Sequence, residues 1–131
     1  MSFAQEMLEL KSLLEARGHS CLIPNETIGY ADGKIEVGRD GSEGARRKIE
    51  HDLIRDHHRK IEQSDAILVV NHSKKGVENY IGGNTFLEMG FAYILGKKIF
   101  LLNDIPELDL IKEELLAMQP VILKGELQRL V

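Results

Sequence analysis

The sequence has one cysteine, Cys21, and lacks any apolar run long enough to cross a bilayer. A single thiol has no partner for an internal disulfide, which fits a reducing compartment, and we expect a cytoplasmic protein. A membrane-spanning helix needs about 20 predominantly apolar residues, so we expect no membrane partner. Residues 1–18 predict an amphipathic helix rather than a signal peptide.

An excess of basic residues is also missing. The 17 Lys and Arg against 21 Asp and Glu leave a net charge of −4 at pH 7. Proteins that bind duplex DNA usually carry a strongly basic face, so we expect no nucleic acid polymer as a partner. The contents of 43% hydrophobic and 29% charged residues are typical of a globular protein, and the length predicts one domain, residues 1–131.

Amphipathic segments alternate with short apolar runs that read as buried strands. The helices are predicted over residues 3–18, 45–64, 85–96 and 105–118. The strands are predicted over residues 19–24, 65–71, 97–103 and 120–123. This order implies right-handed crossovers and a mainly parallel sheet. We therefore expect an α/β fold: a doubly wound, flavodoxin-like or Rossmann-like three-layer sandwich. Residues 25–44 are polar and glycine-rich and predict a long loop.

In open α/β sheets, ligands bind outside the carboxyl ends of the strands. The segments predicted at this edge are Asn71 with the loop after it, the helix start at Thr85, Asn103–Asp104, and Ser2 with Phe3. Asp65 begins its strand, so we expect it at the opposite edge, as a turn residue.

Glu88 is the only charged residue in the apolar segment 86–95. With Thr85 it matches the capping box, in which the carboxylate bonds back to the helix start and favours the helix dipole. Alternatively, Phe91 and Ala92 place Glu88 on an apolar stripe, and a half-buried carboxylate at the ligand edge suits a nucleophile or base. The spacing leaves both interpretations open.

Two segments resemble the nucleoside 2-deoxyribosyltransferase family and its relatives, the deoxynucleotide N-glycosidases. They are SDAILVVN at residues 64–71 and GGNTFLEMGFAYILGKKIFLLN at residues 82–103. In that family a strand leads to a loop with a G-(x)-T-x-x-E-x-G-type motif, then an apolar helix, a GK pair and a strand. The likeness extends from Ser2 to about Leu123, because residues 2–24 also resemble the family's opening helix and second strand.

The resemblance implies an activity on the N-glycosidic bond of 2′-deoxynucleosides or their 5′-monophosphates, by transfer or by hydrolysis. The family's nucleophilic glutamate falls on Glu88, which would form a covalent deoxyribosyl intermediate. The residues that the resemblance and the edge argument assign to substrate binding are Ser2, Phe3, Asn71, Gly83, Asn84 and Thr85. No cofactor and no metal are implied. Relatives are oligomers, so we expect a homodimer or a larger homo-oligomer.

Two features depart from the family pattern. The family usually has an active-site aspartate eight residues before the strand start, and counting back from Asp65 gives His57, next to Asp56. His57 is either a surface helical histidine or a proton donor near neutral pH. The family's first strand is also missing ahead of Ser2. We therefore expect a reading frame that continues upstream or a truncated variant.

An alternative function is a catalytically silent nucleotide-binding or regulatory module of the same fold, which both departures favour. A flavodoxin-like or receiver-like domain is a further alternative. Receivers need an acidic cluster at the end of the first strand, which this sequence lacks, and a flavin would colour the preparation yellow.

Overall fold

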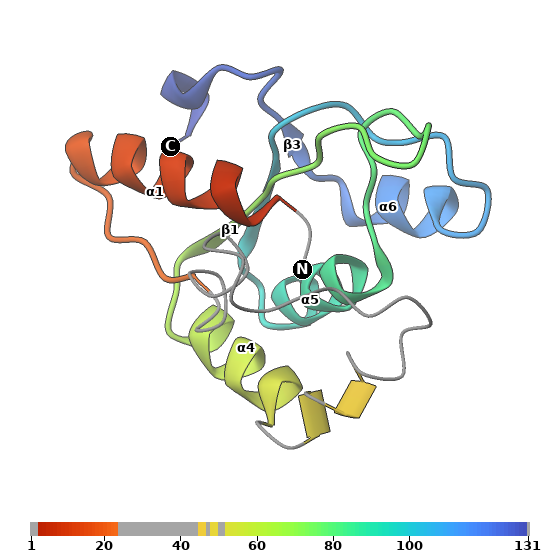
Figure 1. Ribbon diagram of the computed structural model, residues 1–131, viewed down its shortest axis with the longest axis horizontal. Helices are drawn as coiled ribbons and strands as arrows, with labels where there is room; N and C mark the ends of the chain where they lie inside the picture. The colour runs from red at the N-terminus through yellow and green to blue at the C-terminus, as the bar shows by residue number, and fades with distance from the viewer. Residues whose placement is uncertain (1–2, 24–44, 47, 50–51, 131) are drawn as a thin grey trace. The chain divides into compact units, whose positions relative to one another are not determined.

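The computed structural model describes residues 3–23, 45–46, 48–49 and 52–130 (Figure 1). The chain divides into two compact units, residues 1–60 and 61–131. Ser2 and the loop predicted over residues 25–44 lie outside the described residues.

The first unit begins with helix α1, Ala4–Ala16, which confirms the predicted opening helix. Helix α1 ends at Ala16 and has Arg17 as its C-cap, and the next residue, Gly18, has a φ of 92°, which glycine adopts readily. The amide of Gly18 donates to the carbonyl of Glu15, and the amide of His19 donates to the carbonyl of Leu14 at 3.1 Å. These bonds satisfy carbonyls that the helix end leaves without an intrahelical donor.

The strand predicted at residues 19–24 is wrong for the part described, because residues 19–23 have no regular secondary structure. Leu22 is exposed rather than buried, so this segment lacks the apolar environment of a central strand. The carbonyl of Ile23 accepts a hydrogen bond from the Lys60 ammonium at 3.0 Å, and this contact comes from a helical side chain rather than a neighbouring strand.

Helix α4, Leu53–Glu62, covers the second half of the helix predicted over residues 45–64. Asp52, just before it, has a φ of 50° and interrupts the predicted helix. Aspartate adopts this left-handed conformation more easily than most residues, and apolar periodicity carries no signal for it. Residues 45–46 and 48–49 are helical on the other side of the break.

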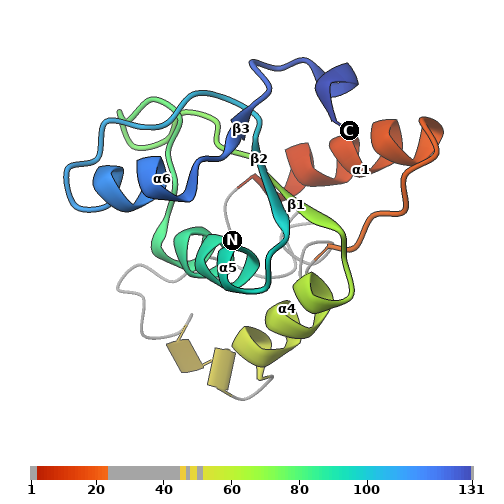
Figure 2. The ribbon, with the colours of Figure 1, turned by 180° about the vertical axis from the view of Figure 1, so that it is seen from behind.

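The second unit contains a three-stranded parallel sheet in the order β1-β2-β3 (Figure 2). Its strands are β1, Ala66–Val69, β2, Lys98–Leu101, and β3, Val121–Ile122. Ala66 pairs with Lys98 and Phe100 pairs with Val121. Helix α5, Gly83–Ile94, connects β1 to β2, and helix α6, Lys112–Met118, connects β2 to β3. The last element among the described residues is the 3-10 helix η1, Leu127–Arg129. The fold is therefore α/β, with an all-parallel sheet alternating with helices.

The apolar runs become the core of this unit. Met89 and Ala92 of α5, Leu101 of β2 and Leu115 of α6 are fully buried and belong to one hydrophobic cluster. Burying a side chain of the size of leucine or methionine stabilises a fold by about 1.5–3 kcal/mol. Because both helices contribute to this cluster, the core fixes the orientation of α5 on the sheet.

Helix α6 is shorter than the predicted segment 105–118. Pro106 is fully buried and Ile105 packs against the core. The segment before α6 therefore contributes side chains to the core although its backbone is irregular. The amides of Ile111 and Lys112 both donate to the carbonyl of Leu108, and this turn leads into the helix.

Candidate functional site at the carboxyl ends of the strands

Asn71 and Asn103 join the ends of β1 and β2. The Asn71 amide nitrogen donates to the carbonyls of Asn103 and Asp104 at 3.1 and 3.0 Å, and its oxygen accepts from the Asn103 main-chain amide at 2.8 Å. The Asn103 side chain donates in return to the Asn71 carbonyl at 3.1 Å. Asn71 is fully buried. The Asn71 side chain thus holds the two strand ends together. That Asn71 also contacts a substrate remains a prediction.

The loop after β1 turns back at residues 74–77. The amides of Lys74 and Val77 each donate to the other residue's carbonyl, at 3.0 and 2.9 Å. Lys75 and Gly76 both have positive φ, as a type I′ turn requires. The Lys74 ammonium lies 5.7 Å from the centre of the Tyr80 ring. Backbone hydrogen bonds and the contact of Lys74 with Tyr80 therefore stabilise the loop after β1 from within.

Helix α5 starts earlier than the sequence predicts, with Gly82 as its N-cap. Thr85 is the third residue of the helix and no side chain caps its start. The capping-box interpretation of Thr85 and Glu88 is therefore wrong. Glu88 lies in the second turn, and the first turn contains no acidic residue. Because the dipole effect falls off within the first turn, the structure does not support that explanation of Glu88 either.

Glu88 is half-buried on α5, and one of its carboxylate oxygens accepts a hydrogen bond from the Asn84 side-chain amide at 2.8 Å. Residues four positions apart lie on the same face of a helix. Side chains on a helix also point back toward its N-terminus. The Glu88 carboxylate is therefore drawn toward the first turn of α5, which follows the carboxyl end of β1.

The structure brings together four of the predicted site residues: Gly83, Asn84, Thr85 and Glu88 on the first two turns of α5. Gly83 is exposed, whereas Asn84 and Thr85 are half-buried. A Cβ atom added at Gly83 would meet no atom within 4 Å, so the space beside this residue is open.

The remaining predicted site residues belong to the first unit or are not described. Phe3 is the N-cap of α1 and has a φ of 62°. His57 is buried on α4, with 4% of its surface exposed, so the interpretation as a surface histidine is wrong. With Leu53 and Ile61 it forms the buried stripe of that helix at a spacing of four residues.

Asp65 precedes β1 at the amino edge of the sheet, as predicted.

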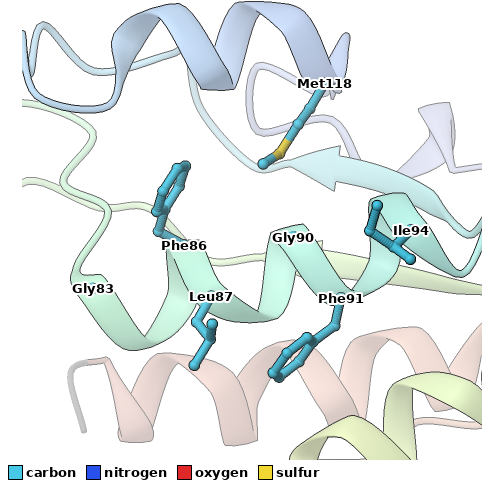
Figure 3. A pocket seen from close by; sticks show the side chains of 7 residues that line it. All are labelled: Gly83, Phe86, Leu87, Gly90, Phe91, Ile94 and Met118. Atoms are coloured by element: carbon cyan, nitrogen blue, oxygen red, sulfur yellow. The ribbon is translucent and has the colours of Figure 1, made fainter.

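An apolar hollow of about 490 Å³ lies along α5 and was not predicted from the sequence (Figure 3). Phe86 and Met118 extend toward each other, and Leu87 and Phe91 extend from another side of the helix. Gly83 and Gly90 also line the hollow. At about 100° per residue, these glycines project about 140° and 160° away from Glu88. The part of the hollow lined by the glycines therefore faces away from the carboxylate, whereas Phe91, three residues from Glu88, lines it about 60° from the carboxylate around the helix.

Within the described ranges, no group of three or more His, Cys, Asp and Glu side chains is arranged to hold a metal ion. In the same part of the chain, no helix has the length and apolarity needed to cross a bilayer.

Comparison with protein families, curated proteins and solved structures finds no match to this chain. The likeness to the deoxyribosyltransferases therefore rests on the segments quoted from the sequence.

Proposed function

We propose that this protein cleaves the N-glycosidic bond of 2′-deoxynucleosides or their 5′-monophosphates, with Glu88 as the nucleophile. The observation that carries the proposal is the position of Glu88. It is a half-buried carboxylate, hydrogen-bonded by Asn84 at 2.8 Å, near the start of the helix that follows β1. In an open parallel sheet this edge is where ligands bind.

The reaction proceeds by double displacement. A Glu88 carboxylate oxygen attacks C1′ of the deoxyribosyl group, the C1′–N bond breaks, and its electron pair leaves with the base, which takes a proton from an acid or from water. Water or a second base then attacks C1′ and the ester bond to Glu88 breaks. The attacking water or base gives up a proton and the carboxylate is restored in both cases. The product is deoxyribose or a new nucleoside, or the 5-phosphate of either when the substrate is a 5′-monophosphate. The absent 2′-OH eases the development of positive charge at C1′.

The surrounding residues differ in what they contribute to this chemistry. The first turn of α5 also contains Gly83, which projects about 140° away from Glu88 around the helix, so its open side does not lead to the carboxylate. Half-buried Thr85 lies on the same turn and has a hydroxyl group that can bind a sugar oxygen. Asn71 keeps the two strand ends together through its three hydrogen bonds, so it supports the edge on which the site is built.

The finer fold assignment belongs to the same proposal. The parallel order β1-β2-β3 with a helix in each connection is consistent with a doubly wound, three-layer sandwich of the flavodoxin-like or Rossmann-like kind. We also propose a homo-oligomer. The apolar side chains of Leu87, Tyr93 and Ile94 on α5 are 41%, 52% and 83% exposed, and light scattering of the purified protein tests this assembly.

The test is an activity assay with each 2′-deoxynucleoside and each 5′-monophosphate, with and without a second base, followed by separation of the products. We expect free base from at least one substrate. A new nucleoside or nucleotide in the presence of the second base identifies a transferase, and deoxyribose or its 5-phosphate alone identifies a hydrolase. Calorimetric binding of a nucleotide without any turnover would replace this proposal with the silent nucleotide-binding module.

A further inference from the structure

We propose that Asn84 is a positioning residue that orients the Glu88 carboxylate for attack on the sugar. This inference rests on the proposed function. Its evidence is the hydrogen bond of 2.8 Å from the Asn84 amide nitrogen to Glu88 Oε1, made between two residues of the same helix. Because both residues are on α5, the contact does not depend on how any loop is arranged.

Stabilisation of the helix alone is a poor explanation of an asparagine at position 84. Asparagine is a weak helix former in helix interiors, and at helix starts it usually bonds to backbone amides as an N-cap. Here the N-cap is Gly82 and no side chain caps the helix. The amide of Asn84 donates to the carboxylate instead. A side-chain pair at this spacing stabilises a helix only slightly, so its larger effect is on the carboxylate itself.

A fixed carboxylate favours the reaction because orientation is a large part of the barrier to forming the glycosyl ester. A glutamate side chain has several rotatable bonds, and the hydrogen bond from Asn84 selects conformations that point toward the start of α5. The bond is charge-assisted while Glu88 is ionised. An ester carbonyl oxygen also accepts a hydrogen bond, so the contact persists after C1′ has bonded to the other carboxylate oxygen.

The experiment compares steady-state kinetics of the wild type with Asn84→Ala, Asn84→Asp and Asn84→Gln. A positioning residue acts on the reacting group, so we expect Asn84→Ala to lower kcat about tenfold or more while KM changes less than about twofold. Asn84→Asp keeps the shape but replaces the donor with a second carboxylate, and we expect at least an equal loss. Asn84→Gln retains an amide and should recover part of the rate.

Two controls separate this inference from a folding defect. Glu114→Ala changes an exposed residue of α6 that belongs neither to the proposed site nor to the apolar surface of α5, and its kcat should equal that of the wild type. Circular dichroism of each variant checks that the helices form.

The possible failures are distinguishable. If Glu88→Gln is as active as the wild type, the proposed function fails. If Glu88→Gln is inactive but Asn84→Ala has unchanged kcat, the positioning role is refuted while the function stands. A raised KM with unchanged kcat in Asn84→Ala would instead make Asn84 a direct contact to the substrate and would likewise overturn the inference.

Discussion

Replacing Asn71 with alanine should destabilise the protein more than the same substitution at Asn103, the other asparagine that joins the ends of β1 and β2. The Asn71 side chain is fully buried and makes three hydrogen bonds across the ends of β1 and β2. At about 1 kcal/mol for each hydrogen bond, their loss costs about 3 kcal/mol. Asn71→Ala also leaves the Asn103 amide and two carbonyls without this partner, and unsatisfied buried groups add to the cost.

Asn103→Ala is the matched control for this prediction. The Asn103 side chain makes one hydrogen bond, to the Asn71 carbonyl at 3.1 Å, and it is only half-buried. We therefore expect a loss of about 1 kcal/mol for Asn103→Ala. Urea unfolding of both variants and the wild type, followed by circular dichroism, gives the free energies of unfolding and the slopes m.

Asn71→Asp adds a second, pH-dependent test. The carboxylate introduced at position 71 has nearly the same shape as the asparagine amide. At neutral pH, however, it presents an acceptor oxygen, in place of the amide donor, to the carbonyls of Asn103 and Asp104. Burial and these carbonyls raise the pKa of the new carboxyl above its unfolded value, so the variant should be more stable below the unfolded pKa. That stability should be lost as the pH rises through the folded pKa. Equal destabilisation by Asn71→Ala and Asn103→Ala, or no pH dependence of Asn71→Asp beyond the wild type, would refute the reasoning.

Three further predictions concern the helices and the thiol. Met89→Ala should lower the free energy of unfolding by about 2–5 kcal/mol, because Met89 is fully buried; a loss below about 1 kcal/mol in urea unfolding would contradict the burial of Met89 in the core. Gly90→Ala should raise it by about 0.5–1 kcal/mol, because a Cβ there meets no atom within 4 Å and alanine favours the helix interior; a lower midpoint than the wild type would show that the space is occupied. Burial and, next, the charge of Glu15 raise the pKa of the Cys21 thiol, whereas Lys11 lowers it. Alkylation of Cys21 near pH 8 should therefore become faster in Glu15→Gln and slower in Lys11→Gln, as measured by mass spectrometry, and opposite changes would contradict this account.

The strands and the apolar helix of the second unit could be predicted because their sequences bury apolar side chains. The runs at residues 65–71 and 97–103 contain β1 and β2, and the segment 85–96 contains most of α5. The predicted strand 19–24 was wrong over residues 19–23, the part that the structure describes, because a short apolar run becomes a strand only where a neighbour can pair with it. The break at Asp52 was missed because one residue with positive φ leaves the apolar spacing on each side intact.

The candidate site was only partly predictable for a similar reason. Chain order alone places Glu88 on the helix after β1, at the edge where open parallel sheets usually bind ligands. The capping-box interpretation was wrong because it placed the start of the helix at Thr85, whereas the backbone becomes helical at Gly83. The four-residue spacing of Asn84 and Glu88 was present in the sequence and could have indicated their contact. The buried location of His57 and the apolar hollow on α5 depend on tertiary packing, which the spacing of residues does not reveal.

The central claim is that the Glu88 carboxylate forms and breaks the bond to the sugar. The most direct test compares the rate of base release by the wild type, Glu88→Gln and Glu113→Gln, which makes the same chemical change at an exposed residue of α6. We predict that Glu113→Gln retains the wild-type rate and that Glu88→Gln falls to the background rate of the solution without protein. Equal rates for the wild type and Glu88→Gln would contradict the account.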